Sequence, residues 1–359
     1  MNTTAVSPAI KGVLESLACG RDLSMMEAAQ VLREIMEGEV GPVQAAAFLM
    51  GLRAKGETAQ EIVGLAETMR SLAETVEVGG QFPLVDVVGT GGDGLGTFNI
   101  STTAAFVAAG AGACVAKHGN RGASSRSGAA DVLEALGVSI DLPPRSVAQC
   151  IREVGIGFMF APLHHTAMRH VVTVRKELGI RTVFNFLGPL TNPAGARRQL
   201  TGVSVPEYVP VLAEAQAAMG CDHALVAHGE EGMDELSVAG RSLVMEVREG
   251  RAGSLFHLEP EMFGLSRHPV QSLSGGEPER NAEITESVLG GRSGAPRDVV
   301  LLNAGAALYV SGCAASIQEG VDAAAESIEE GRAAEKLAAL RDCTRRLAGD
   351  LSEGRGVSP

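Results

Sequence analysis

The chain has 359 residues, of which 45% are hydrophobic and 20% charged, so it can bury a large core and is long enough for two structural units. Its 43 acidic and 30 basic residues give a formal net charge of −13, which opposes non-specific attraction to nucleic acid or to an anionic membrane. Aromatic residues make up only 3% of the chain, which leaves little material for stacking bases. We therefore expect neither a nucleic-acid nor a membrane partner.

The six cysteines are scattered, with no CxxC pair and no dense framework suited to disulfides. The first twenty residues lack a basic start followed by an apolar run, and no segment holds eighteen uninterrupted apolar residues. These features favour a location in the reducing cytoplasm.

The first quarter of the chain carries helix-start signals. Ser24 with Glu27 forms a capping-box pattern, and Thr58 with Glu61 repeats it. We expect residues 1–78 to form a small all-helical unit. The inserted helices of residues 164–190 are expected to join this unit in space.

From residue 79 onward, short apolar runs alternate with helix-like segments, which predicts an α/β fold with a mainly parallel central sheet flanked by helices. This large unit is expected to cover residues 79–163 and 191–350, followed by a flexible tail at 351–359. The expected strands are 84–88, 113–117, 138–140, 156–160, 199–205, 224–227 and 242–247. The expected helices include 164–178, 298–309 and 317–347.

A glycine-rich loop with the sequence GTGGD follows the first expected strand, at residues 89–93. The string NIST at 99–102 then opens an alanine-rich helix. Glycines let backbone N–H groups approach phosphate oxygens, and a helix N-terminus adds unpaired donors, so this context predicts an anion site. The loop matches neither the Walker motif nor the dinucleotide fingerprint, and a purely structural turn is the alternative.

A second polar loop begins with the string KHGNR at residues 117–121, again at the end of an expected strand. Loops at the carboxyl ends of neighbouring parallel strands meet at one crevice, so both loops are expected to face the same ligand. The alternative is that Lys117 and Arg121 are ordinary surface charges and that His118 is a turn residue.

Two further features suit charged ligands. Asp234 and Glu235 lie side by side on an expected loop, and Mg²⁺ prefers such oxygen ligands, although a solvated surface pair is the alternative. Arg175, on an expected helix, has a guanidinium that can bind a carboxylate through two hydrogen bonds, unless it is a plain surface arginine.

The histidines at 164, 165 and 170 lack a zinc-motif spacing, which argues against a zinc site.

Together, the strings GTGGD, NIST, KHGNR, LGPLTNP and DELS resemble those of the anthranilate phosphoribosyltransferase family, over nearly the whole chain. The resemblance implies transfer of the phosphoribosyl group of 5-phosphoribosyl 1-pyrophosphate (PRPP) to anthranilate, with release of pyrophosphate, early in tryptophan biosynthesis. It also implies Mg²⁺, with two ions per active site, and a homodimer formed through the small helical unit.

The resemblance also implies roles for individual residues. Lys117 and Arg175 are implied to act in catalysis by positioning and electrostatics. Ser101, Asp234 and Glu235 are implied Mg²⁺ ligands. Those implied for anthranilate are Gly89, His118, Asn120 and Arg175. Those implied for PRPP are Gly89, Gly92, Asp93, Thr97, Asn99, Ile100, Ser101, Thr102, Lys117, His118, Gly119, Asn120, Ser124 and Ser125.

Two positions depart from the family pattern, since many relatives have serine at Ala129 and some have an aromatic residue at Met168. Two alternative functions stay open. One is a pyrimidine nucleoside phosphorylase, whose second loop is closer to KHSTGG than to KHGNR. The other is a non-catalytic relative that binds nucleic acid, which the net charge of −13 and the intact DELS string oppose.

Overall fold

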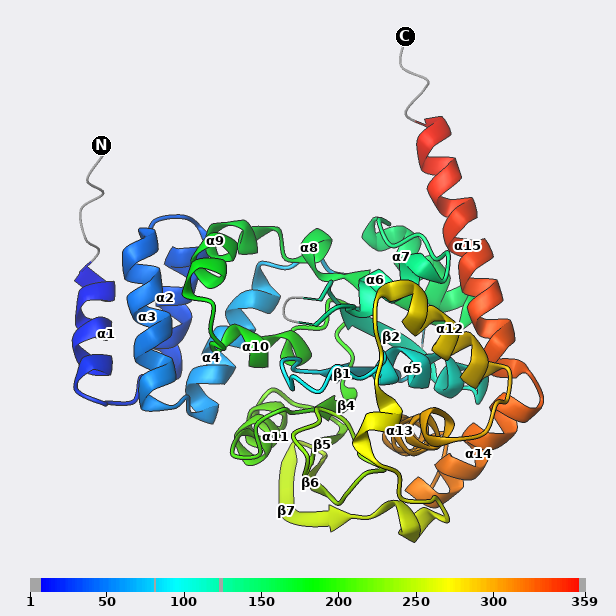
Figure 1. Cartoon of the computed structure of the whole chain (residues 1–359). Helices are drawn as coiled ribbons and strands as arrows, with labels where there is room; N and C mark the ends of the chain where they lie inside the picture. Colours follow the sequence, from blue (N-terminus) through cyan, green and yellow to red (C-terminus); the bar gives the residue numbers. More distant parts are fainter. Residues whose placement is uncertain (1–7, 81, 123–124, 355–359) are drawn as a thin grey trace.

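The computed structural model describes residues 8–80, 82–122 and 125–354, and consists of a helical unit beside a larger α/β unit (Figure 1). The helical unit begins with four helices. They are α1 (Pro8–Ala18), α2 (Met25–Met36), α3 (Pro42–Lys55) and α4 (Ala59–Ser71). Both expected capping boxes are confirmed, because the side chains of Ser24 and Thr58 accept from the backbone N–H three residues on.

Seven strands form one sheet in the order β3-β2-β1-β4-β5-β6-β7. Strands β1 to β5 are parallel to one another. Strand β6 is antiparallel to β5, and β7 is antiparallel to β6. The predicted mainly parallel sheet is therefore confirmed. The strands are β1 (Leu84–Gly89), β2 (Cys114–Gly119), β3 (Ile156–Phe160), β4 (Arg198–Gly202), β5 (His223–Gly229), β6 (Ser242–Arg248) and β7 (Arg251–Leu258).

Helices cover both faces of the sheet, which confirms the predicted fold class. One buried cluster contains alternate β5 residues such as Leu225, and the other contains Ala224 and Val226 together with the helical unit. The flanking helices are α5 (Ile100–Gly110), α6 (Ala129–Ala135), α7 (Pro144–Val154), α11 (Tyr208–Ala218), α12 (Pro278–Leu289), α13 (Ala295–Ser311), α14 (Ile317–Glu329) and α15 (Arg332–Gly354).

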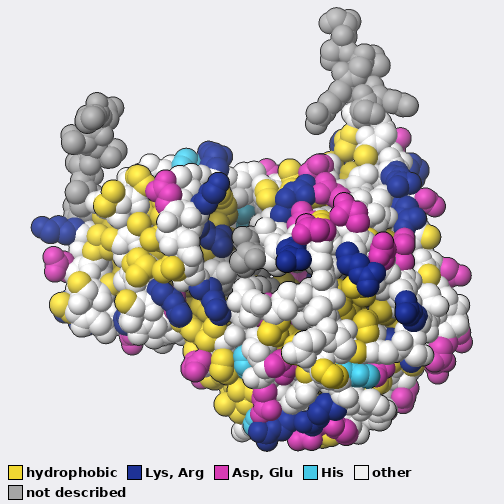
Figure 2. Space-filling view, viewed as in Figure 1, with side chains coloured by type: hydrophobic (Ala, Val, Ile, Leu, Met, Phe, Trp, Pro, Cys, Tyr) yellow, Lys and Arg dark blue, Asp and Glu magenta, His cyan; other side chains and the backbone are white. Residues whose placement is uncertain are grey.

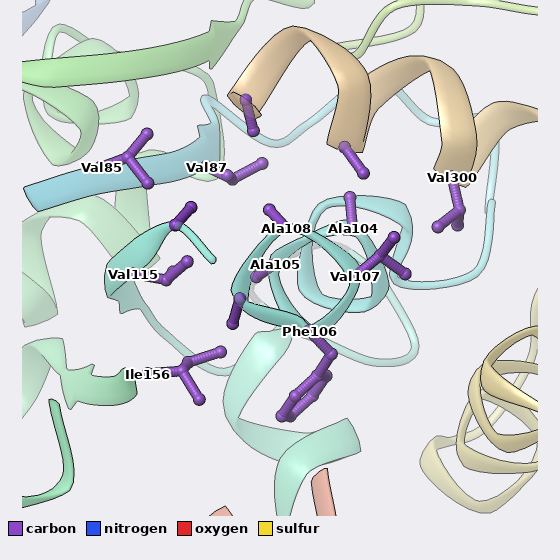
Figure 3. Packing of buried hydrophobic residues seen from close by; sticks show 14 of the residues in the cluster. Val85, Val87, Ala104, Ala105, Phe106, Val107, Ala108, Val115, Ile156 and Val300 are labelled. Atoms are coloured by element: carbon purple, nitrogen blue, oxygen red, sulfur yellow. The ribbon is translucent and has the colours of Figure 1, made fainter. Parts of the chain in front are cut away.

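The N-terminus of helix α5 belongs to the first expected anion site, and the small side chains of this helix allow it to pack closely against the sheet. Figure 3 shows Ala105 and Ala108 of α5 on the side of the valines of β1 and β2, whereas Ala104 and Val107 lie on the side of α13, which carries Val300. These alanines are fully buried. The tight packing holds the N-terminus of α5 at the carboxyl end of β1.

The inserted segment between β3 and β4 packs on the helical unit. It contains α8 (Ala161–His164), α9 (Arg169–Leu178) and α10 (Phe184–Leu187). Helix α9 contacts α2 and α3, and α10 contacts α4. The single helix expected at 164–178 is wrong, since a short 3-10 turn at Thr166–Met168 separates α8 from α9.

Several expected elements differ in the structure. Residues 138–140 form no strand, and Val138 and Ile140 are apolar because a loop buries them in the core. The helix expected at 317–347 is two helices, because Gly331 has a φ of 78° and ends α14. Residues 351–354, expected in a flexible tail, complete α15. Among the described residues, no helix is both long and apolar enough to cross a membrane.

Candidate active site

The strand order reverses between β1 and β4, since the chain proceeds from β1 to β2 and β3 on one side and from β4 to β5 on the other. Ligands of open α/β sheets bind outside the carboxyl ends of the strands at such a switch point. Here β1 ends at Gly89 and β4 ends at Gly202. A Cβ on Gly202 would lie 1.5 Å from the Asp234 carbonyl oxygen, and one on Gly89 would lie 2.1 Å from Asp234 Oδ2. Glycine at both positions therefore leaves the space in which the DELS loop lies against the switch point.

The first glycine-rich loop connects β1 to α5 and is tied to the DELS loop. The Gly91 N–H donates to Asp234 Oδ2 at 2.6 Å. Thr97 forms a bridge with Ser274, and Asn99 precedes the first residue of α5. Ser101 and Thr102 lie in the first turn of α5, and the buried Thr102 hydroxyl has no hydrogen-bond partner among the described residues. Of these two residues, Ser101 lines the small cavity beside the DELS loop.

Three carboxylates converge at the switch point. Carboxylate oxygens of Asp93, Asp234 and Glu235 lie within 4.8 Å of one another. Among the described residues, no other three His, Cys, Asp or Glu side chains come together in this way. Burial and mutual repulsion raise the pKa of Asp234 to about 6 and raise that of Glu235 well above its usual value. Glu235 Oε2 is buried without a partner in the described part of the chain. An oxygen-rich, strongly repelling cluster fits a hard divalent cation such as Mg²⁺.

A small cavity adjoins this cluster and is lined by Ser101, Asp234, Glu235 and Asn303, among others. Asn303 of α13 holds the DELS loop in place. Its side chain accepts from the Leu236 N–H at 3.1 Å and donates to the Leu236 carbonyl oxygen at 2.8 Å. These two bonds fix the backbone directly after the two carboxylates, and sequence analysis did not single out this asparagine.

Lys117 is a buried cation beside the same cavity. Its Nζ donates to the Val87 carbonyl oxygen at 2.6 Å and lies 3.4 Å from Ser101 Oγ. Burial lowers the pKa of Lys117, whereas the carboxylates of Asp86 and Glu235 raise it. The idea that Lys117 is an ordinary surface charge is wrong, because the residue is 3% exposed.

The second loop is closed by a carboxylate. Asp131 Oδ2 accepts from the Gly122 N–H at 2.9 Å and from the Gly128 N–H at 2.8 Å. Arg121 forms ion pairs with Asp131 and Glu134. Its charge is therefore used within the second loop and α6, and does not face the ligand that both loops are expected to bind. Asn120 and Ser125 are exposed on this loop, whereas Ser124 lies outside the described residues.

His118, at the end of β2, is buried beside the inserted segment. Its Nδ1 lies 3.2 Å from the Gly188 carbonyl oxygen, and its ring centroid lies 5.1 Å from that of His165. Burial lowers the pKa of His118 to about 3 and that of His165 to about 4, so both rings are neutral at physiological pH. The His118 Nε2 and both ring nitrogens of His165 have no partner among the described residues.

Arg175 lies on α9, which is packed beside α2 and α3 of the helical unit (Figure 1). Its guanidinium lies 5.2 Å from the Phe184 ring centroid, and no carboxylate of a described residue pairs with it. Burial lowers the pKa of Arg175, but a guanidinium stays charged. Within the described residues, Arg175 makes no direct bond to either loop.

Arg181 is a further cation that sequence analysis missed. It donates to Ser204 Oγ at 3.1 Å, and Ser204 in turn donates to the Gly91 carbonyl oxygen at 3.0 Å. Its charge lowers the pKa values of Asp93 and Asp234, against the effect of their burial. No local motif marks this arginine, because its partners come from the loops after β1 and β4.

The structure therefore brings most of the sequence-predicted residues to one edge of the sheet. Those at the switch point come from the two loops and the DELS segment. Arg175 and His118 lie toward the helical unit, and Ser124 is not described. The expected residues at the strand ends and loops are Gly89, Gly92, Asp93, Thr97, Asn99, Ile100, Ser101, Thr102, Lys117, His118, Gly119, Asn120, Ser125, Asp234 and Glu235.

Comparison with known proteins agrees with this architecture. Residues 81–334 match the glycosyl transferase family α/β domain, and residues 11–73 match the helical bundle domain of the same family. The anthranilate phosphoribosyltransferase of Rubrobacter xylanophilus is 54% identical over 341 residues, covering 95% of this chain and 99% of that protein.

Solved structures give the same result. The anthranilate phosphoribosyltransferase of Thermus thermophilus superposes with a TM-score of 0.87 at 47% identity, covering 93% of this chain and 99% of that one. The Saccharomyces cerevisiae enzyme, solved in complex with PRPP and Mg, has a TM-score of 0.86 at 30% identity, covering 96% of this chain and 99% of that one. The chain therefore belongs to the anthranilate phosphoribosyltransferase family.

Proposed function

We propose that the chain transfers the phosphoribosyl group of PRPP to anthranilate, giving N-(5-phosphoribosyl)anthranilate and pyrophosphate, in an early step of tryptophan biosynthesis. The observation that carries this proposal is the meeting of two glycine-containing loops and three carboxylates at one switch point, where Asp234 is buried and Asp93 and Glu235 are half-buried. The family membership of the chain supports it.

PRPP is proposed to lie across the two loops. Backbone N–H groups of the glycine-rich loop and the N-terminus of α5 stabilise anionic oxygens where pyrophosphate leaves. The buried Lys117 adds a positive charge beside Ser101, and its short bond to the Val87 carbonyl oxygen fixes its position. The proposed PRPP contacts are Gly89, Gly92, Asp93, Thr97, Asn99, Ile100, Ser101, Thr102, Lys117, His118, Gly119, Asn120, Ser124 and Ser125.

Mg²⁺ is proposed to bind at Asp234, Glu235 and Ser101, with two ions per chain, and Asp93 lies close enough to join them. The raised pKa values of Asp234 and Glu235 support this, because a cation would offset the repulsion between them. When bound, Mg²⁺ supplies positive charge that offsets the charge of the pyrophosphate leaving group.

Anthranilate is proposed to bind between the second loop and the helical unit, near Gly89, His118, Asn120 and Arg175. The guanidinium of Arg175, which pairs with no carboxylate of a described residue, suits the substrate carboxylate. The aniline nitrogen is already neutral, so the site mainly has to align it with the ribose carbon. A His118 pKa of about 3 makes that ring a neutral hydrogen-bonding group that orients the substrate.

We also propose that residues 1–78 and 164–190 form one helical unit, with 79–163 and 191–350 as the α/β unit, and that the helical unit forms a homodimer contact. Packing of α9 against α2 and α3 supports the first point. Figure 2 shows hydrophobic side chains gathered over the helical unit. Met26 of α2, Val43 of α3 and Val172 of α9 are 77%, 81% and 54% exposed. Such a patch is typical of an interaction surface.

A cytoplasmic location is proposed as well. It is supported by the scattered cysteines, which form no CxxC pair and no dense framework suited to disulfides. Recovery of the native protein in a membrane or secreted fraction would contradict this location.

The proposed reaction is tested by following loss of anthranilate fluorescence with the purified chain, PRPP and Mg²⁺. Decay should require all three, and product analysis should show stoichiometric pyrophosphate. If a folded chain gives no decay, the phosphorylase alternative is tested next with pyrimidine nucleosides and phosphate.

Replacing the proposed carboxylate-binding arginine should affect the KM for anthranilate and the KM for PRPP differently. Arg175→Ala should raise the anthranilate KM by about tenfold to a hundredfold, because a charged hydrogen-bonding pair is lost, and should change the PRPP KM by less than about twofold. Lys176→Ala, at the exposed next position, is the matched control. Equal rises in both KM values would refute the assignment.

The paired substitution Asp234→Asn with Glu235→Gln should lower Mg²⁺-dependent turnover by about a hundredfold or more, since metal stabilisation is worth several kcal/mol. The same variant should melt at a higher temperature in EDTA, because repulsion among the three clustered carboxylates is removed.

Manganese binding followed by electron paramagnetic resonance, in the presence of PRPP, should count two ions per wild-type chain and fewer in that variant. Glu230→Gln, an exposed carboxylate on the same loop, serves as the control. Unchanged Mg²⁺ dependence of the paired variant would return Asp234 and Glu235 to a structural role.

The proposed dimer surface is tested by charge. Val43→Glu combined with Val172→Glu should convert a particle of twice the chain mass into a monomer in light scattering, because two charges would be buried without partners. Met262→Glu, a similarly exposed apolar position on the α/β unit, should leave the mass unchanged. A wild-type chain that is monomeric at micromolar concentration would contradict the dimer.

A further inference from the structure

Asn281, in the first turn of α12, is a buried side chain whose polar atoms all serve the neighbouring loops. It is 1% exposed. Its Oδ1 accepts from the Gly276 N–H at 2.8 Å, and its Nδ2 donates to Asn99 Oδ1 at 2.9 Å. The residue belongs to an element that sequence analysis did not predict, and nothing in the proposed chemistry uses it directly.

The segment before Asn281 is paired with the exit of the first loop. The Phe98 N–H donates to the Leu273 carbonyl oxygen at 3.0 Å, and the Gly275 N–H donates to the Gly96 carbonyl oxygen at 2.9 Å. Between these bonds, Thr97 and Ser274 form an antiparallel bridge. The first loop therefore enters α5 along a short two-stranded ribbon that ends beside Asn281.

Asn99 then joins this ribbon to the second loop. Its Nδ2 donates to the Ser127 carbonyl oxygen at 3.2 Å, and its Oδ1 accepts from the Ser127 hydroxyl at 3.1 Å as well as from Asn281. Both anion loops are thus held at a defined separation by the carboxamide of Asn99.

The direction of this hydrogen-bond chain is set at both ends by the backbone. The Gly276 N–H can only donate, which leaves the Asn281 Nδ2 facing Asn99. The Ser127 carbonyl can only accept, which requires the Asn99 Nδ2 on that side. The Ser127 hydroxyl can rotate to donate or accept, whereas the Asn281 amide cannot. The Ser127 carbonyl and the Asn281 amide therefore together set which way the Asn99 carboxamide points, and Asn281 is the only side chain of the two.

We propose that Asn281 is a positioning residue for PRPP binding, which acts by orienting Asn99 and by holding the two anion loops at a fixed separation. The inference rests on the proposed function, because Asn99 matters to catalysis only if PRPP lies across these loops. The Asn99 Nδ2 has two hydrogens and donates one to the Ser127 carbonyl oxygen, which leaves the second available to a ligand oxygen. Loss of the Asn281 amide would remove one of the two fixed groups that orient the Asn99 carboxamide, and it would remove the bond that ties this carboxamide to α12.

The test is Asn281→Leu, which keeps a similar volume and removes both hydrogen-bonding atoms. The PRPP KM should rise on the order of tenfold, as for other groups that orient ligand-binding residues. The anthranilate KM should change by less than about threefold. The matched control is Thr285→Val on the same helix, which removes the buried bond to the Thr103 hydroxyl at 2.9 Å without touching the Asn99 carboxamide.

Both variants should lose thermal stability, because each loses buried hydrogen bonds. Only Asn281→Leu should change the PRPP KM. Equal KM changes in the two variants, or a change that follows melting temperature, would show a structural role and overturn the proposal.

Asn281→Ala covers the case in which the leucine variant does not fold. It is compared in the wild-type chain and in an Asn99→Ala background. If Asn281 acts through Asn99, the Asn281→Ala substitution should raise the PRPP KM of the wild-type chain. In the Asn99→Ala background, the same substitution should raise the PRPP KM by less than about twofold. Independent, multiplicative effects would overturn the proposal. A wild-type chain that does not consume anthranilate defeats the proposed function itself, whereas an active wild type with an unchanged Asn281→Leu KM defeats only the positioning role.

Discussion

The close approach of the DELS loop to the ends of β1 and β4 is the constraint on which the site depends. At Gly89 and Gly202 a single added carbon would overlap Asp234. Because both strands end in glycine, the loop after β5 can cross the switch point and place two carboxylates against the first glycine-rich loop. Asn303 then holds this loop through the Leu236 backbone. Backbone contact, more than side-chain packing, positions the acidic group.

The electrostatics of the site follow from that placement. Three carboxylates lie within 4.8 Å of one another, with Asp234 buried and the other two half-buried, and desolvation together with mutual repulsion raises the pKa values of Asp234 and Glu235. Lys117 lies close enough to Glu235 to oppose part of this repulsion. The acidic group therefore costs stability in the absence of a cation, which is the electrostatic setting of the Mg²⁺ site that we propose. On the other side of the crevice, the neutral ring of His118 adds no charge near the proposed aromatic substrate.

The two loops are held by partners distant in sequence. Asp131 closes the second loop on itself, while the 273–281 segment pairs with the exit of the first. Asn99 joins the two. An anionic substrate would thus meet donors whose directions are set before binding, which is the arrangement that electrostatic stabilisation of a leaving group requires. The helical unit, by contrast, contributes Arg175 from a separate packed body, without a bond to the described residues of either loop.

Local sequence was sufficient for the features that depend on local physics. Capping boxes at Ser24 and Thr58, the alternation of strands and helices, and glycine loops placed after strands each follow from neighbouring residues, and the structure confirms them. Val138–Ile140 was misassigned because a buried loop and a short strand have the same apolar pattern. The break at Gly331 was missed because one glycine is compatible with a continuous helix.

Only the tertiary structure decided which polar groups meet. Asp93 joins Asp234 and Glu235 across about 140 residues of chain, Arg121 turns to Asp131 and Glu134, and Asn281 reaches Asn99 across 182 positions. Hydrogen bonds and ion pairs act over a few ångströms, so their partners are set by sheet order and helix packing, which the spacing of residues along the chain does not encode.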